Sequence, residues 1–486
     1  MSVEKSTPET REKSIESLSK KELLILVVKL QDTIVKMQEE ISELKRRVNM
    51  NSSNSSKPSS TNGYKKPDKK RSLKGKSDKK RGGQKWHKGA TLRPYEKPDS
   101  VEVLEIEDCV ECGNNLRDIP MINIKKRQVV DIPEPIYFVL EYQWWEKQCP
   151  CCQSITKSVF PPWVVGDIQI WPNIKAHSAY FYNYGMIWYQ RIQELLKEFY
   201  GLDISQTSLM KFNKEGYENL ESVSLRIRNA IKNSSVANGD ETGVRVDKSL
   251  YWIHVASTKL FTDYLVDPKR WQEALDKMGI LIEFIGILVH DHWLPYFSYS
   301  GCIHALCHAH HLRELIAILQ NETVSWAESM KSFLIDMQSK KEVAMKKGID
   351  RFDDDTLLTI RTEYRQIIAQ GQMEYPEPVR KEWQRGKLKK SKGHNLLIRF
   401  RDYEDANLQF LYDFSVPFDN NLAERDLRMI KVRTKVSGCF RSLEWAEWFC
   451  RIRGYISTMR KQGFPIYQAM KSIFEGEVLS PNFECT

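Results

Sequence analysis

Residues 236–322 contain a run of short strand-like segments that constrains the fold more than any other part of the chain. Three strands are predicted in direct succession, because β-branched and aromatic residues gather there between turn-forming residues. An almost wholly apolar segment ends at Asp291, and helical patterns lie before and after it. Strands that first follow each other and then alternate with helices predict a mixed α/β sheet. The predicted strands are 236–246, 250–257, 260–266, 285–289 and 302–307, with helices at 270–278 and 310–320.

The strand order expected from this pattern is that of a ribonuclease H-like core, in which the first and fourth strands are neighbours. Its first part is residues 236–322, and residues 406–475 supply its last part together with the C-terminal helices. The charged, helical stretch between them is interpreted as an insertion. The other predicted parts are a coiled-coil helix (1–50), a disordered basic linker (51–98), a zinc-binding domain (99–165), a helical DNA-binding region (166–235) and the insertion (323–405).

The N-terminal helix carries apolar residues in alternating steps of four and three, the spacing of a heptad repeat. This pattern predicts pairing with another copy of the chain, and hence a homodimer or a higher oligomer. The alternative is a single amphipathic helix that packs on its own chain. The residues of this heptad seam are Leu23, Val27, Leu30, Ile34, Met37, Ile41, Leu44 and Val48.

The net charge of +10 is concentrated in one stretch. Residues 64–93 contain 13 Lys and Arg against 2 Asp, a local net charge of +11. Such an arm fits DNA, because bound lysines and arginines displace counterions from phosphates; the alternative is a solvated linker. The apolar run at residues 23–28 is too short to cross a membrane, and the N-terminus does not resemble a secretory signal. We therefore expect a cytoplasmic protein without a membrane partner.

Two CxxC pairs, Cys109/Cys112 and Cys149/Cys152, have 36 residues between them. A CxxC turn places two thiolates on one metal ion, and four thiolates close a tetrahedral site. The pairs therefore predict one structural Zn²⁺. Cys151 remains an alternative ligand to Cys152. A redox-active cysteine pair is the other interpretation, but the surrounding pattern does not resemble a thioredoxin fold.

Residues 166–235 have a helical pattern, and within it residues 191–199, 201–205 and 206–213 are typical of a helix, a turn and a second helix capped by Ser205. This arrangement resembles a helix-turn-helix DNA-binding motif. An ordinary helical hairpin remains equally open.

Three carboxylates are candidates for a divalent-metal site. Asp240 lies within the first predicted strand and Asp291 at the end of the fourth, so a sheet with these strands as neighbours brings them together. Glu424 lies on a late helix and supplies the third oxygen ligand. Hard oxygen ligands on rigid elements suit Mg²⁺ at a phosphate. Glu241, Asp419 and Asp426 are the alternatives to these three, and adjacent residues of a strand, such as Asp240 and Glu241, face opposite sides.

The late helix also carries cations. Asn421, Glu424 and Arg428 share one helix face through their spacing of three and four. The alternative treats the acidic residues of this helix as partners in surface salt bridges. We expect the nearby cations to meet DNA phosphates: Arg425, Arg428, Lys431 and Arg433.

Histidines crowd around the fifth predicted strand, at His304, His308, His310 and His311, with Cys307 among them. The cluster allows a second transition-metal site, but we favour packing and phosphate contact near the active centre, with Arg313 one helical turn further on.

These features together resemble the insertion-sequence-66 family of bacterial transposases over nearly the whole chain. The matching segments occur in the family's order: "NSSNSSKPSS", "RGGQKWHKG", the paired cysteines ending in "RQVVDIP" and "CPCC", "DETGVRV", "HDHWLPY", "CHAHHLREL" and "DNNLAERDLRMIKVRTKVSGCFRS".

The resemblance implies a DDE transposase that cuts the ends of an insertion sequence and transfers them into target DNA with two Mg²⁺ ions. Asp240, Asp291 and Glu424 match the metal-binding trio, and Cys307 and His310 match a C-x-x-H signature. Accessory proteins encoded by the element are further expected partners. Two residues depart from the family's pattern, since His292 and Gln153 stand where glycine is common. The alternative functions are a catalytically inactive, element-derived DNA-binding or repressor protein and a repair nuclease.

Overall fold

The computed structural model describes residues 19–51, 54–55, 94–131, 137–377, 388 and 390–484. The chain forms two compact units. One comprises Met1–Lys70, Ile170–Ile192 and Ser205–Thr486, and the other comprises Arg71–Gln169 and Gln193–Ile204. The basic stretch at residues 64–93 lies outside the described residues, so its predicted role as a DNA-binding arm stays a prediction.

A five-stranded mixed sheet is the centre of the first unit, as the strand pattern predicted. The order of the strands is β5-β4-β3-β6-β7. The first three strands of this sheet, β3, β4 and β5, pair antiparallel, and β6 and β7 add in parallel beside β3. The predicted adjacency of the first and fourth strands is therefore confirmed. The strands are β3 (Val236–Val246), β4 (Ser249–Ser257), β5 (Thr262–Asp267), β6 (Ile287–His290) and β7 (Ile303–Leu306).

Both faces of β6 are buried, as its almost wholly apolar sequence requires. Ala237 and Leu288 belong to one hydrophobic core. Val289 and Ala305 belong to a second core on the opposite face. Alternation along the strands therefore assigns successive residues to two different helical layers.

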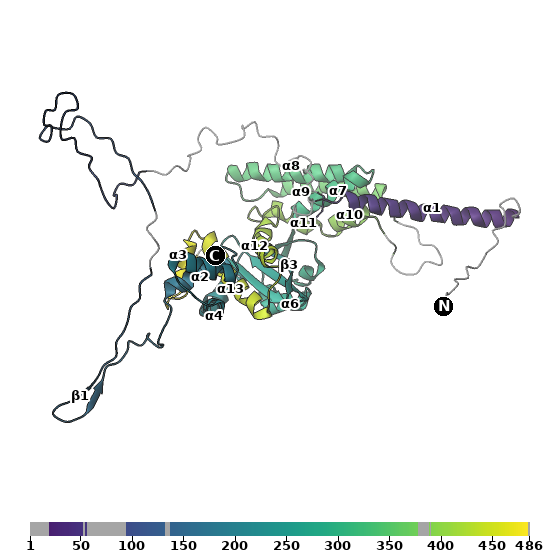
Figure 1. Cartoon of the computed structure of the whole chain (residues 1–486). Coiled ribbons are helices and arrows are strands. Elements are labelled where there is room, and N and C mark those ends of the chain that lie inside the picture. Colours follow the sequence, from purple (N-terminus) through teal and green to yellow (C-terminus); the bar gives the residue numbers. More distant parts are fainter. Residues whose placement is uncertain are drawn as a thin grey trace, which may run out of the picture. The chain divides into compact units, whose positions relative to one another are not determined.

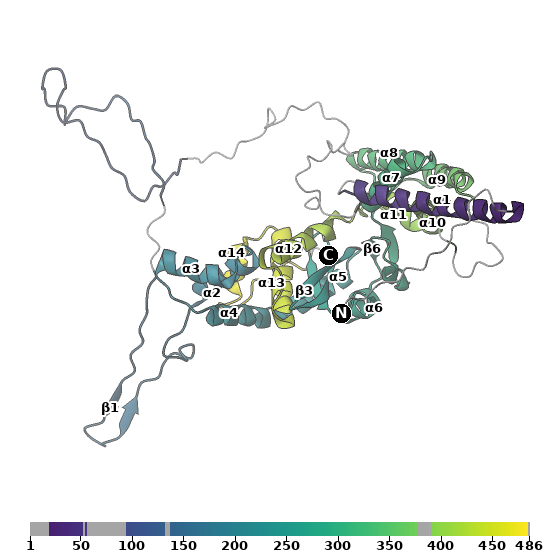
Figure 2. The same ribbon diagram turned by 45° about the vertical axis from the view of Figure 1, so that its right-hand side comes forward.

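Five helices share the second core with β6 and β7 (Figures 1 and 2). Trp326 lies at the centre of this layer and is fully buried. The predicted insertion is thus helical, as expected, but it does not form a core of its own, because its apolar side chains pack with those of the sheet. The helices are α7 (His308–Asn321), α8 (Trp326–Lys346), α9 (Asp354–Glu374), α10 (Lys392–Asp402) and α11 (Glu404–Tyr412).

In the first core, helices that precede the sheet in the sequence and helices near the C-terminus pack on the other face of the sheet. Helix α13 approaches β5 closely, and a Cβ atom at Gly454 would lie 3.1 Å from the carbonyl oxygen of Thr262. Helix α12 contacts β3 and β4. The helices of this core are α2 (Pro172–Asn183), α5 (Glu221–Lys232), α6 (Gln272–Met278), α13 (Leu443–Lys461) and α14 (Ile466–Ser472). The same unit also contains α4 (Gln206–Asn219) and α12 (Asn421–Ser437).

The predicted helix, turn and capped helix are present as α3 (Tyr189–Tyr200) and α4. Gly201 adopts a left-handed conformation with φ of 68° after α3, and the Ser205 hydroxyl accepts a hydrogen bond from the backbone N–H of Ser208. The cap is therefore confirmed. A DNA-binding role for this pair stays a prediction.

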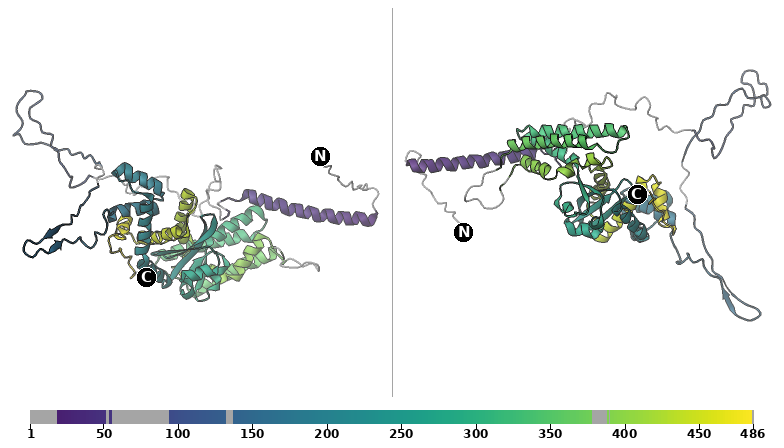
Figure 3. Two further views of the ribbon diagram at one scale, coloured as in Figure 1. Left: turned by 60° about the horizontal axis from the view of Figure 1, so that its bottom comes forward. Right: turned by 180° about the vertical axis from the view of Figure 1, so that it is seen from behind.

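In the second unit, the β-branched and aromatic residues of segments 101–106, 126–132 and 137–145 predict three strands, and this prediction is wrong for the described residues of all three. The strands present are β1 (Glu146–Gln148) and β2 (Ile155–Lys157), which form a short hairpin (Figure 3). A strand needs a neighbour to complete its backbone hydrogen bonds, and the described residues of these segments belong to no strand pair. An isolated bridge joins Asp108 and Asn115, which lie outside the three segments.

Helix α1 (Lys20–Asn49) covers the predicted coiled-coil segment. All eight seam residues are at least partly exposed, from 36% at Leu23 to 82% at Val48. Among the described residues, no helix is long and apolar enough to span a membrane.

Candidate active site

Asp240 lies on β3, and Asp291 directly follows the neighbouring strand β6. Strand β3 pairs with β6 in parallel, with Val236 opposite Ile287 and Asn238 opposite Val289. Continuing this register by two residues places Asp240 opposite Asp291. Because side chains alternate along a strand, this register favours the same face of the sheet for the two carboxylates.

Glu424 reaches this face through Asn420, a residue that sequence reasoning missed. Asn420 precedes α12 and is buried; its side-chain amide accepts a hydrogen bond from Asn238 Nδ2 at 2.8 Å and donates one to the backbone oxygen of Gly239 at 2.7 Å. These two bonds fix the start of α12 beside Asp240. The signal in the sequence was the Asn-Asn pair before Glu424, of which only Asn421 was selected.

Burial and other acidic side chains disfavour the ionised form of Asp240. Burial raises the pKa of Asp240 to about 8, and the negative charges of Glu241, Asp291 and Glu424 act in the same direction. A cation at this position would relieve both the burial and the repulsion. The donor set of three carboxylates fits a hard divalent cation.

In the described structure, the ligand atoms of Asp240, Asp291 and Glu424 do not all lie within 4.8 Å of one another. Those of Cys307, His310 and Glu424 do. The separation of the three carboxylates is compatible with two metal ions, which stand about 3.5–4 Å apart in two-metal sites and need not share every ligand.

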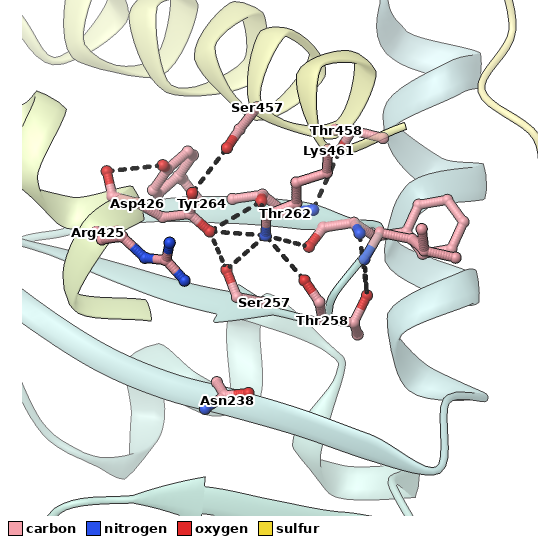
Figure 4. Close-up of polar contacts among 12 residues, drawn as sticks. Asn238, Ser257, Thr258, Thr262, Tyr264, Arg425, Asp426, Ser457, Thr458 and Lys461 are labelled. Atoms are coloured by element: carbon pink, nitrogen blue, oxygen red, sulfur yellow. Dashed lines mark hydrogen bonds and ion pairs between the residues drawn. The ribbon is translucent and has the colours of Figure 1, made fainter. Parts of the chain in front are cut away.

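Asp426, an alternative to Glu424, is already engaged. Its carboxylate forms an ion pair with Lys461 on α13, with Oδ2 2.8 Å from Nζ. Figure 4 shows the hydroxyl groups of Ser257, Thr262 and Ser457 around the same carboxylate. Burial opposes ionisation, but Lys461 and these hydroxyls outweigh it, so the pKa of Asp426 lies below its ordinary value. Asp426 therefore anchors α12 and has no free oxygen for a metal.

Lys461 is the second residue that sequence reasoning missed. Its ammonium group also donates to the backbone oxygens of Thr258 and Phe261, at 2.9 and 3.0 Å. The side chain is 14% exposed. This network ties α12 and α13 to the loop between β4 and β5 (Figure 4).

Glu241 is also occupied. Its side chain accepts hydrogen bonds from Arg270 Nε at 3.0 Å and from the Tyr296 hydroxyl at 3.1 Å, and it is 3% exposed. Tyr296 packs against Gly239, where a Cβ atom would meet its ring at 3.1 Å. Gly239 and Glu241 thus face Tyr296, whereas Asn238 faces α12, which confirms that Asp240 and Glu241 point to opposite sides.

The predicted cations of α12 divide into two groups. Arg425, Arg428 and Lys431 are exposed, as a contact with DNA requires. For Arg433 the prediction is wrong: it is 5% exposed, and its guanidinium lies 4.0 Å from the centroid of the Tyr182 ring. Its position on α12 turns it toward α2, so it contributes to packing and cannot meet DNA.

A pocket of about 250 Å³ opens beside Asp291. Arg270 and Arg399 are paired with Glu241 and Glu314, and neither was selected from the sequence. Burial lowers the pKa of His292 to about 3, so this ring is neutral at physiological pH. The pocket is lined by Arg270, Asp291, His292, Trp293, Cys307, His310, His311, Glu314 and Arg399.

The other histidines of the cluster are mainly packing residues, as favoured from the sequence. His308 and His311 are 1% exposed, and their Nδ1 atoms lie 3.1 Å apart. Burial lowers the pKa of His308 to about 4. His304 contacts His290 at 3.0 Å. His310 differs from them, because its Nδ1 is buried without a hydrogen-bond partner among the described residues.

Each cysteine pair of the second unit lies in a tight turn. The backbone N–H of Gly113 donates to the oxygen of Cys109, and that of Gln153 donates to the oxygen of Cys149. Gly113 and Gln153 both have left-handed backbones, with φ of 72° and 60°. Gln153 therefore adopts the conformation that glycine favours, and the departure from the family's pattern leaves the turn intact. The four thiols do not form one group within 4.8 Å in the described structure.

Comparison with known families agrees with this geometry. Residues 168–447 match the model of the transposase IS66 family. This match covers more than half of the chain. The chain belongs to the IS66 family of transposases. Residues 6–93 also match a family of unknown function, DUF6444. No curated protein matches the chain. Membership of the IS66 family implies a DNA-processing enzyme that acts in DNA transposition, binds DNA and uses divalent metal ions.

Proposed function

We propose that this chain cuts DNA at the ends of an insertion sequence and joins the freed ends to target DNA by a two-metal DDE mechanism. The observation that carries the proposal is the alignment of Asp240 with Asp291 across β3 and β6, with Glu424 held over β3 by Asn420. The strand order also supports a ribonuclease H-like core, because three antiparallel strands are followed by two parallel ones beside the first.

Asp240, Asp291 and Glu424 are the residues that would hold two Mg²⁺ ions. When bound, such ions stabilise charge on the attacking and leaving oxygens of a phosphoryl transfer. Asp240 must lose its proton to serve as a ligand, and a cation lowers the cost of its ionised form. The carboxylates of the chain position the ions and need not form a covalent bond to DNA.

The remaining residues of the site bind and orient the DNA. Exposed Arg425, Arg428 and Lys431 would contact backbone phosphates along one side of α12. Arg313, whose Nη2 lies 3.4 Å from Glu424 Oε1, would balance the charge of that carboxylate. Because the substrate is DNA, we place the protein in the bacterial cytoplasm, where it works with any accessory proteins of its element.

The alternative function is a catalytically inactive DNA-binding or repressor protein. The retention of all three carboxylates argues against it. A direct test incubates the full-length chain with duplexes that carry the terminal repeats of its element, with Mg²⁺ or with a chelator. We expect strand cuts at the repeat ends and joined products with Mg²⁺ only. Specific binding without cleavage in Mg²⁺ and in Mn²⁺ would favour the repressor.

We also propose that Cys109, Cys112, Cys149 and Cys152 bind one structural Zn²⁺. Each pair forms half of a zinc site, and Cys152 is favoured over Cys151 because its thiol interacts with Cys149 and Ser154, which lowers its pKa to about 7. Large apolar residues of this region are exposed, including Leu104 at 92% and Ile122 at 103%. A bound metal that draws the two turns together would organise such a segment.

The zinc proposal predicts that Cys109→Ser and Cys152→Ser each lower the zinc content by one ion per chain. Three remaining ligands hold zinc less tightly than four thiolates do. Elemental analysis of purified protein measures the content, and limited proteolysis reports loosening of residues 99–165. Cys151→Ser is the matched control and should keep the ion. Equal zinc content in all three variants would contradict the site.

We further propose that α1 forms a coiled coil with a second copy of the chain. The exposed seam favours this over packing of α1 on its own chain. Two DNA ends must be held together for transposition, and a dimer supplies one binding unit for each end.

Charge on the seam should separate the copies. Ile34→Asp with Ile41→Asp places four carboxylates in the core of a two-stranded coil, where burial of charge is costly. Sedimentation equilibrium should then show a shift from dimer to monomer. Val28→Asp with Val35→Asp is the matched control, because these residues have the same spacing but lie beside the seam. Val28 is 52% exposed and Val35 is 53% exposed. A dimer that survives both pairs would refute the coiled coil.

A further inference from the structure

Cys307, His310 and Glu424 form a cluster that the proposed cleavage mechanism does not explain. Their ligand atoms all lie within 4.8 Å of one another. Cys307 directly precedes α7, and His310 lies in the first turn of that helix, where its backbone N–H donates to the Cys307 oxygen at 3.2 Å. Glu424 lies in the first turn of α12. The beginnings of two helices therefore bring a sulfur, a nitrogen and an oxygen donor together.

The side chains are available to a ligand. His310 Nδ1 is buried, has no hydrogen-bond partner among the described residues, and lies 3.9 Å from Glu424 Oε1, too far for a hydrogen bond. A buried ring nitrogen without a partner is uncommon, because its lost hydration is not replaced. Bound metal would satisfy this atom.

A backbone hydrogen bond orients the sulfur of Cys307, but burial raises the pKa of this thiol, so its thiolate requires a bound cation. Its side chain is 1% exposed, and its Sγ accepts a hydrogen bond from the backbone N–H of Asn420 at 3.1 Å. Such N–H donors to sulfur orient and stabilise metal-bound thiolates. Asn420 also anchors α12 to β3, so the same residue supports Cys307 and the helix that carries Glu424.

The donor set selects the class of metal. Thiolate and imidazole are softer ligands than Mg²⁺ prefers, and together with one carboxylate they suit Zn²⁺. Ligands around Zn²⁺ lie about 3.3–3.8 Å apart, given bonds of about 2.0–2.3 Å. Small side-chain shifts would bring the three atoms to these distances. Arg313, beside Glu424, must move aside for the ion.

We propose that Cys307, His310 and Glu424 bind one zinc-class ion, with the fourth position open to water. The site would join the start of α7 to the start of α12. Glu424 has two carboxylate oxygens, so it can serve this ion and, if the proposed cleavage function holds, the Mg²⁺ site as well. Binding of the zinc-class ion itself does not depend on that function.

Cobalt reports on the site directly, because Co²⁺ replaces Zn²⁺ and gives a near-ultraviolet charge-transfer band for each bound thiolate. Two full-length variants, Cys307→Ser and Cys302→Ser, are stripped of metal and then titrated with Co²⁺. Cys302 is the matched control, since it is buried nearby but its thiol donates to the backbone oxygen of Tyr299. Signal from the CxxC pairs is common to both variants and cancels in the difference. We expect Cys307→Ser to bind one cobalt ion fewer and to lose one thiolate band.

Two further variants keep the test decisive if Cys307→Ser does not fold. His310→Gln retains the sulfur and should weaken cobalt binding at this site at least tenfold. Asp240→Asn should leave the band unchanged while DNA cleavage is lost, which separates this site from the Mg²⁺ site. The proposal is overturned if Cys307→Ser or His310→Gln, once folded, binds cobalt with the same stoichiometry and spectrum as Cys302→Ser.

Discussion

Asp240→Asn is expected to lower the rate of DNA strand cleavage by roughly 10³-fold or more, about 4 kcal/mol of transition-state stabilisation. The amide keeps the shape of the side chain but cannot supply a charged oxygen to a metal ion. Glu424→Gln should have a similar effect, because it removes the ligand contributed by α12. Cleavage of end-labelled duplexes under single-turnover conditions measures both rates.

Stability and DNA binding provide the controls for this result. Without metal, Asp240 is buried close to Glu241, Asp291 and Glu424, so a neutral amide should leave the unfolding temperature unchanged or raise it. Binding of the terminal repeats, measured by fluorescence anisotropy, should be retained. Asp247→Asn makes the same chemical change at an exposed turn after the same strand and should cleave normally. Normal cleavage by Asp240→Asn would end the case for the DDE site.

Lys461→Met is expected to cause the largest loss of stability. It leaves the Asp426 carboxylate buried with no cation, and breaking a buried ion pair in this way costs about 3–5 kcal/mol. Chemical denaturation of the first unit measures the change in free energy of unfolding. Cleavage should fall too, because Asp426 lies two residues from Glu424 and its ion pair sets the position of α12.

A second substitution separates charge from shape. Adding Asp426→Asn to Lys461→Met removes the unpaired charge, so the double variant should regain part of the lost stability. Arg460→Met is the matched control, because Arg460 is exposed and neighbours Lys461 on the same helix. A double variant no more stable than Lys461→Met would show that the ion pair is not what holds α12 in place.

The strands of the five-stranded sheet could be predicted closely from the sequence. The strands of residues 99–165 could not. β3 has the bounds that the sequence predicted, because the period of hydrophobic residues is a local signal. Segments 101–106 and 137–145 have a strand-like composition but no paired neighbour in the structure. Composition indicates whether a segment favours the strand conformation, but it does not show whether another strand lies beside it.

The candidate site shows the same division within a single helix. Glu424, Asp426 and Arg433 all lie on α12, and each could serve the site as judged from the sequence. Packing gives them different partners. Glu424 lies beside Arg313, Asp426 is paired with Lys461, and Arg433 stacks on Tyr182. Neither Lys461 nor Tyr182 is near α12 in the sequence, so no local pattern could have indicated these pairs.

The sequence by itself determined the order of the elements and the family, and it predicted the three carboxylates, because these inferences depend on local periodicity and on motifs of fixed spacing. Only the tertiary structure decided which charges are free and which are paired, and it revealed that Cys307, His310 and Glu424 share one location. The physical reason is that burial sets the cost of each unpaired charge or ring nitrogen. Burial arises from contacts between segments more than a hundred residues apart, such as those of Cys307 and Asn420.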